Sequence, residues 1–371
     1  MIDCSTIEGQ IRAMNRCSVL SSVIIKKVNA IKNANFWVKD ASGNDVNKPK
    51  ELERMLRPNP LQTLRDFIGQ VEYYTQVHGQ AYICRIASEG MPGDFDIYTL
   101  PNGKVQKVTH INSGRLPFDP DYDVISYCVS VGGITLTIDR DDMFIVRDVG
   151  GNAGGNAGGN SRMVPLQNSI NTFVASYESV QELMVNRGML GIISLTSDDD
   201  ILKNQNIPIT KDELRTLREA IKHYGTMSDQ MKHMVTPFRA SYTPVSSNIV
   251  DLGLTDVQRN CRKDIADQYQ VPSVLLDVEN TPYANTSEAK KILYNDAIIP
   301  EADHIMDTLN RIYGYKDFRV AATYDHLEFY QEAKRQQASG ASAFSAQLIR
   351  MMDAGILSQS EVRAEWDKYV I

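Results

Sequence analysis

Apolar residues recur at spacings of three and four along several long stretches of the chain, the pattern of a helix with one buried face. The clearest case is residues 63–78, which end at Gly79, a residue suited to a helix C-cap. Pro300 predicts a kink in one helix, and Ser339-Gly340 predicts an interruption in another. Helices are predicted at residues 19–34, 63–78, 166–187, 210–224, 255–269, 287–313 and 326–353.

Shorter stretches that are rich in β-branched and aromatic residues separate these helices and predict strands. Gly132-Gly133 joins two of them and predicts a tight hairpin. Helices mixed with antiparallel strands indicate an α+β fold for the first 250 residues. Strands are predicted at residues 35–38, 80–85, 97–100, 105–111, 122–131, 134–138, 143–147, 190–195, 235–237, 240–244 and 318–324.

Residues 150–161 read GGNAGGNAGGNS and carry almost no side chains. Such a segment gains too little from packing to offset its ordering entropy, so we expect a mobile loop. A phosphate-binding loop of the GxxxxGK[ST] type would need a lysine after the glycines, and none is present. A flexible insertion is therefore favoured over a phosphate site.

The composition is that of an ordinary globular protein: 371 residues, 42% hydrophobic and 23% charged, with a formal net charge of −7. This acidic balance argues against a simple nucleic-acid binder. No run of apolar residues approaches the length of a membrane span, and residues 1–16 lack the apolar core of a signal peptide. Five dispersed cysteines without a CxxC pair disfavour a disulfide framework or a zinc site and suit a reducing cytoplasm.

Catalytic motifs are weak throughout the sequence. Ser287-x-x-Lys290 matches the SxxK pattern of penicillin-binding enzymes, but neither SDN nor KTG accompanies it. The acidic triplet at 198–200 lacks the spacing of a calcium loop, and His304 has no HExxH or HxH partner. We therefore predict a non-enzymatic protein without a metal or another cofactor.

Six groups of segments, in chain order, resemble the portal proteins of tailed bacteriophages of the HK97 type. The most specific is 264–276, which ends in Val271-Pro272-Ser273-Val274-Leu275-Leu276. The glycine-rich insertion departs from the family at one loop. The resemblance is carried by residues 56–63 with 78–82, 143–147 with 164–166, 186–188 with 191–193, 264–276, 283–288 with 298–300, and 353–363.

The resemblance implies a portal fold, with an α/β wing, a stem of two helices, a small α/β clip and a tunnel loop, that assembles into a ring of about twelve subunits. Family members continue into a crown, which is expected to be missing or minimal because this chain stops at Ile371. The implied parts are the wing at 1–252 (with the loop at 150–161), the first stem helix at 253–271, the clip at 272–325, the second stem helix at 326–353, the tunnel loop at 354–358 and a C-terminal wing helix at 359–371.

The resemblance also implies where function resides. The tunnel loop would meet DNA through Ala354, Gly355, Ile356, Leu357 and Ser358. Channel-facing candidates on the stem are Lys334, Arg335, Gln336, Gln337, Arg350, Arg259, Arg262 and Lys263, for which an ordinary solvated helix face is nearly as good an account. The clip docking surface would include Glu288, Lys290, Lys291, Lys316, Asp317 and Arg319.

Implied partners are further copies of the chain, double-stranded DNA, terminase, the head–tail connector and the major capsid protein, but no membrane. The implied location is one vertex of the virion capsid, after assembly in the cytoplasm of a bacterial host. Three alternatives stay open: an enzyme that processes nucleic acid through an unrecognised site, a scaffold or adaptor that does not conduct DNA, and the portal of a gene transfer agent or prophage.

Overall fold

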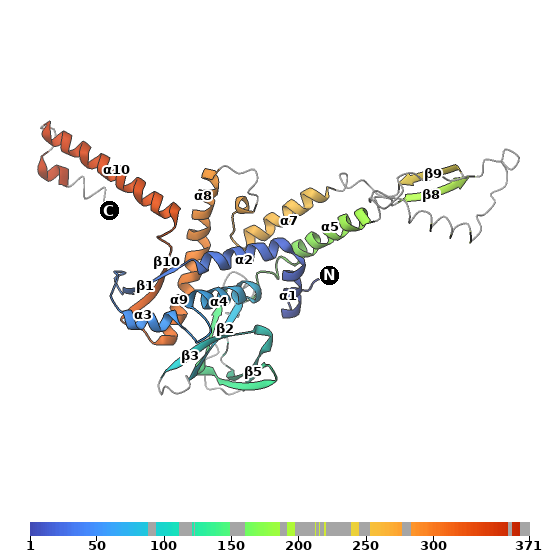
Figure 1. The fold of residues 1–371 in the computed structure, drawn as a ribbon, viewed down its shortest axis with the longest axis horizontal. Helices are drawn as coiled ribbons and strands as arrows, with labels where there is room; N and C mark the ends of the chain where they lie inside the picture. Colours follow the sequence, from blue (N-terminus) through green and yellow to red (C-terminus); the bar gives the residue numbers. More distant parts are fainter. Residues whose placement is uncertain are drawn as a thin grey trace. The chain divides into compact units, whose positions relative to one another are not determined.

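The computed structural model divides the chain into two compact units (Figure 1). Unit 1 comprises Met1–Asn168 and Lys263–Ile371, and unit 2 comprises Ser169–Arg262. The structure describes residues 1–87, 94–110, 121, 123–148, 160–185, 191–196, 212, 215, 219, 239–244, 253–276, 283–354 and 358–363.

Helix α4 (Leu64–His78) is central to unit 1 and packs on α2 (Ser18–Lys32) and on strand β2 (Gln80–Ala87). The Thr63 hydroxyl caps its N-terminus by accepting from the backbone N–H of Asp66. This helix and the α2 helix confirm the periodicity argument. Two further helices were not predicted from the sequence, α1 (Ile7–Arg16) and α3 (Pro49–Leu56).

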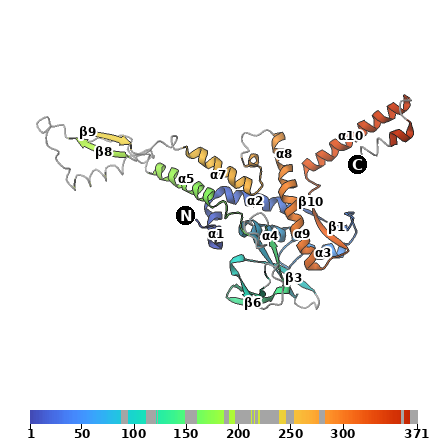
Figure 2. The same ribbon diagram turned by 180° about the vertical axis from the view of Figure 1, so that it is seen from behind.

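Three small antiparallel sheets complete unit 1 (Figures 1 and 2). The hairpin predicted at Gly132-Gly133 is confirmed, because both glycines have positive φ and join β5 to β6. The sheets have the strand orders β3-β2-β7, β4-β5-β6 and β1-β10. Their strands are β1 (Asn35–Asp40), β2, β3 (Phe95–Leu100), β4 (Val105–Thr109), β5 (Val124–Val131), β6 (Ile134–Asp139), β7 (Met143–Arg147) and β10 (Phe318–Thr323).

The helix type changes just before Pro300, where the sequence predicts a kink. Helix α8 (Tyr283–Leu293) leads into a π-helical turn at Tyr294–Ile298, and Pro300 lies in the first turn of α9 (Ile299–Tyr313). A wider helical turn accommodates the proline ring and the missing N–H. The interruption predicted at Ser339-Gly340 is wrong: α10 (Glu328–Asp353) is continuous there, since a single glycine costs a long helix only about 1 kcal/mol.

Unit 2 contains the greater part of two helices. A hairpin lies between these helices in the sequence. The helices are α5 (Gln167–Val185) and α7 (Leu254–Gln268), and the hairpin pairs β8 (Gly191–Thr196) with β9 (Arg239–Pro244). Residues 272–325, for which a clip is expected, fall within unit 1, where β10 pairs with β1. The helix predicted at 210–224, the strand at 235–237 and nearly all of the glycine-rich segment lie outside the described residues.

Charged side chains are buried in the core of unit 1. The Lys27 ammonium, with no exposed side-chain surface, lies 2.6 Å from Glu301 Oε1. The Arg162 guanidinium contacts the same oxygen at 3.2 Å and forms a two-point ion pair with Asp148 at 2.5 and 2.9 Å. Glu72, only 1% exposed, completes what we call the ionic cluster: Lys27, Glu72, Asp148, Arg162 and Glu301. It connects α2, α4, α9 and the chain on both sides of the glycine-rich segment.

Two glycines that end helices provide a matched test of close packing. Gly79 and Gly314 both adopt left-handed backbone, with φ of 77° and 73°. A Cβ atom at Gly79 would lie 2.3 Å from the carbonyl carbon of Asn160, whereas one at Gly314 would meet nothing within 4 Å. We predict that Gly314→Ala lowers the free energy of unfolding by about 1 kcal/mol and Gly79→Ala by more than about 2 kcal/mol, measured by urea denaturation. Equal losses would contradict the close approach at Asn160.

Candidate functional surfaces

Helix α10 carries the largest group of channel candidates. Its first turn is held to the rest of unit 1, because Tyr330 donates to the Asn295 side chain and the Phe329 ring lies 5.4 Å from that of Tyr294. Beyond this turn, Lys334, Arg335, Gln336, Gln337 and Arg350 are all exposed. Lys334 forms an exposed ion pair with Asp325 at 3.3 Å. The structure therefore leaves these five side chains available to an external partner.

The three channel candidates on α7 differ in their exposure to solvent. Arg259 is exposed and pairs with Asp256 at 3.6 Å, one turn earlier in the helix. Lys263 is exposed, whereas Arg262 is partly buried. Two of the three residues thus lie on solvent-facing parts of α7, and their role in a channel stays a prediction.

The six clip candidates do not form one surface. Glu288 and Lys290 are exposed on α8, and Lys291 is partly buried there. Lys316, Asp317 and Arg319 lie beyond the far end of α9, where they line a cavity of about 600 Å³. The helical path from Lys290 to that cavity is roughly 35 Å at 1.5 Å per residue. A single docking partner would therefore have to be large to contact both groups.

The structure describes the first and the last of the five tunnel-loop candidates, Ala354 and Ser358. Ala354 is exposed and ends α10, while Gly355, Ile356 and Leu357 lie outside the described residues. Ser358 begins a helix with a capping box, since its backbone N–H donates to Glu361 Oε2 at 2.8 Å and its hydroxyl accepts from the Glu361 N–H. The Ser358 backbone N–H and the Ser358 hydroxyl, which donates at 2.7 Å, both bind the Glu361 carboxylate and lower the pKa of Glu361.

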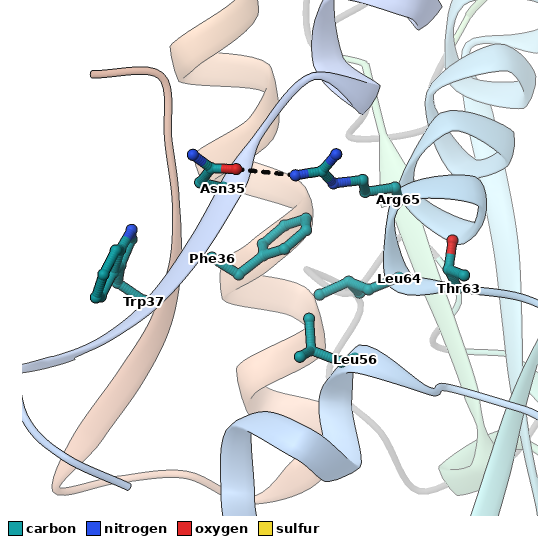
Figure 3. A pocket seen from close by; sticks show the side chains of 7 residues that line it. All are labelled: Asn35, Phe36, Trp37, Leu56, Thr63, Leu64 and Arg65. Carbon is teal, nitrogen blue, oxygen red and sulfur yellow. Dashed lines mark hydrogen bonds between the residues drawn. The ribbon is translucent and has the colours of Figure 1, made fainter. Parts of the chain in front are cut away.

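One pocket was not predicted from the sequence. It lies between β1, α3 and α4, has a volume of about 490 Å³, and is lined mainly by apolar side chains. Figure 3 shows Phe36, Leu56 and Leu64 pointing toward one another, with Trp37 on the other side of β1. A hydrogen bond of 2.8 Å from Arg65 to Asn35 closes one edge. The lining residues come from β1, α3 and the start of α4, and no local sequence pattern groups them.

The described residues contain no group of three or more His, Cys, Asp and Glu side chains arranged to hold a metal ion. Among the same residues, no helix has the length and hydropathy needed to cross a membrane.

A family model described as phage portal protein matches residues 23–367, nearly the whole chain. The chain belongs to the phage portal protein family. This portal protein thus matches the family through both units and through the sequence segments that carried the resemblance. A comparison with curated protein sequences finds no match.

Solved structures show that this portal protein has the fold of known portals. It is similar to a chain in the neck of a native gene transfer agent particle, computed with C12 symmetry, at TM-score 0.63 and 17% identity, covering 96% of this chain and 92% of that one. It is also similar to a chain in the neck of the empty particle, computed with C6 symmetry, at TM-score 0.62 and 16% identity, covering 96% of this chain and 93% of that one. An HK97 family phage portal protein from Corynebacterium diphtheriae is similar at TM-score 0.50 and 11% identity, covering 87% of this chain and 96% of that one.

Exposed and buried lysines that pair with carboxylates should respond differently to substitution. We predict that Lys334→Met changes the free energy of unfolding by less than about 1 kcal/mol, because its ion pair with Asp325 is exposed. Lys27→Met should cost about 3–5 kcal/mol, because it leaves a buried carboxylate short of its partner. Chemical denaturation of both variants tests this. A large loss for Lys334→Met would show that α10 is held by more than its first turn.

Proposed function

We propose that this portal protein assembles into a ring of about twelve subunits at one vertex of a phage capsid, through which double-stranded DNA enters during packaging and leaves during ejection. The main support is the family match over residues 23–367. The similarity to chains in the necks of gene transfer agent particles, one computed with C12 symmetry, supports the ring. The proposed role is structural, without catalytic turnover.

The charge of the chain suits a conduit better than a DNA-binding site. Affinity for DNA rises steeply with the number of phosphates that Lys and Arg neutralise, so a basic bore would hold DNA rather than let it slide. Each subunit instead has a formal net charge of −7. Exposed cations on α10 are interspersed with neutral side chains such as Gln336 and Gln337, so contact with DNA would be weak and reversible.

Unit 2 is the better candidate for the stem and clip than residues 253–353. A stem and clip consist of two helices with a small insert between them, and unit 2 has this order in α5, the β8–β9 hairpin and α7. Residues 272–325 lack an independent unit of their own. On this proposal terminase and the head–tail connector dock on unit 2, and unit 1 is the wing that contacts the capsid protein.

A specific observation favours a second candidate function. Solved structures similar in fold come from gene transfer agent particles, which supports a role as the portal of such a particle instead of a virus. Sequencing the DNA inside purified particles distinguishes the two: fragments of the host genome indicate a gene transfer agent, and a single viral genome indicates a phage.

Ring formation is the first test of the proposed function. Twelve copies of a 41.6 kDa chain give a particle of about 500 kDa with a central hole, which mass photometry and negative-stain images of purified protein would detect. Co-expression with the capsid protein is the control for a ring that closes only on its partner. A stable monomer under both conditions would favour an adaptor or scaffold that does not conduct DNA.

Terminase binding tests the assignment of the docking surface. We predict that Lys290→Glu and Lys316→Glu both leave the affinity for the terminase of the same phage within about twofold, because both residues lie in unit 1. Surface charge reversals are otherwise expected to slow association markedly when they lie in an interface. Biolayer interferometry on assembled rings measures this. A tenfold loss for either variant would restore residues 272–325 as the docking region.

A further inference from the structure

The ionic cluster of unit 1 contains more carboxylates than cations. Lys27 and Arg162 carry two positive charges, whereas Asp148, Glu301 and Glu72 can carry three negative ones. Asp148 and Glu301 are the carboxylates that lie against these cations. Glu72 is left as a third acid with almost no exposure, and an isolated ionised carboxylate is very unfavourable in a protein interior.

The hydrogen bonds around Glu72 show where a proton is needed. The Gln76 amide donates to Glu72 Oε1 at 2.7 Å and to Glu301 Oε1 at 3.1 Å, so the two acids lie on either side of the same NH₂ group. Glu301 Oε2 is buried and has no hydrogen-bond partner among the described residues. Lys27, Gln76 and Arg162 donate to Glu301 Oε1, and a protonated Glu72 is a further nearby group that can donate a hydrogen bond to Glu301.

We propose that Glu72 keeps its proton at neutral pH and donates it to Glu301, so that a shared proton joins α4 to α9 in the core of the wing unit. Ionisation of Glu72 would place a second negative charge beside Glu301 and loosen this contact. The π-helical turn at Tyr294–Ile298 lies immediately before α9 and is the element best able to change register when the contact is lost.

The groups that face Glu72 from the surrounding elements support this assignment. Burial and, after it, the charge of Glu301 on α9 raise the pKa of Glu72 to about 8, although Lys27 of α2 favours the ionised acid. Arg162 also lies within electrostatic range, and its pKa is raised by its carboxylate partners. Tyr324, after β10, is buried and neutral, because burial raises its pKa.

The proton makes stability depend on pH in a defined direction. A carboxyl group whose pKa is raised in the folded state binds more protons than in the unfolded chain, so stability falls as pH rises from about 4.5 toward 8 and levels off above 8. Each pH unit in this window changes the unfolding equilibrium by up to about tenfold for one proton.

Two isosteric variants with different expected results test the proposal. Glu72→Gln supplies a permanent N–H donor, so its denaturation midpoint should fall less between pH 6 and 8 than that of the native protein. Glu301→Gln removes the anion that Lys27 and Arg162 share, and it should lose stability at every pH or fail to fold. An unchanged pH profile in Glu72→Gln, or a loss as large as that of Glu301→Gln, would overturn the proposal.

Infrared spectroscopy gives a readout that does not depend on stability. Native protein at pH 7 should show a carbonyl band of a protonated carboxylic acid that disappears above pH 9 and is missing in Glu72→Gln. Glu8→Gln is the control, because Glu8 is an exposed acid that pairs with Arg12 one turn away. Absence of the band from the native protein at pH 7 would overturn the proposal independently of how the variants fold.

Discussion

A charge is stable in a protein interior only when an opposite charge or hydrogen-bond donor lies within contact distance. The arrangement of unit 1 depends on this constraint at the ionic cluster. Lys27 lies 274 residues before Glu301, and the 2.6 Å contact between them requires α2 and α9 to meet in one geometry. Arg162 adds Asp148 and thereby fixes both ends of the glycine-rich segment. An ion pair buried in the core thus joins the residues on the two sides of this segment.

The same region illustrates how backbone and side chains constrain each other. Gly79 ends α4 in left-handed backbone, and the chain at Asn160–Ser161 passes directly over it. The Ser161 hydroxyl donates to the Val77 carbonyl at 2.6 Å, a carbonyl at the end of α4 that the helix itself cannot satisfy. Arg162 then enters the ionic cluster. Contacts of residues 160–162 thus hold the chain that follows the glycine-rich segment against the core.

The candidate functional surfaces differ from the ionic cluster because they are exposed. The five residues of α10 proposed to contact DNA are exposed in the single chain. The first turn of α10 is anchored by aromatic contacts, and the charged residues after it have few partners within the described part of the chain. The apolar pocket beside Phe36 and Trp37 is similarly open. Neither surface carries the dense polar network that holds the core.

The sequence by itself determined the local elements and the family. Periodicity identified α2, α4 and α9, because burial of one face imposes a spacing that can be read directly, and residue types identified most strands. It missed α1 and α3, which are short, and it placed a break at Ser339-Gly340 where a long helix tolerates glycine. Tertiary structure alone decided which elements meet. The pairing of β1 with β10, the division into two units and the third acid beside Glu301 all join residues that are distant in sequence, and no local pattern encodes such contacts.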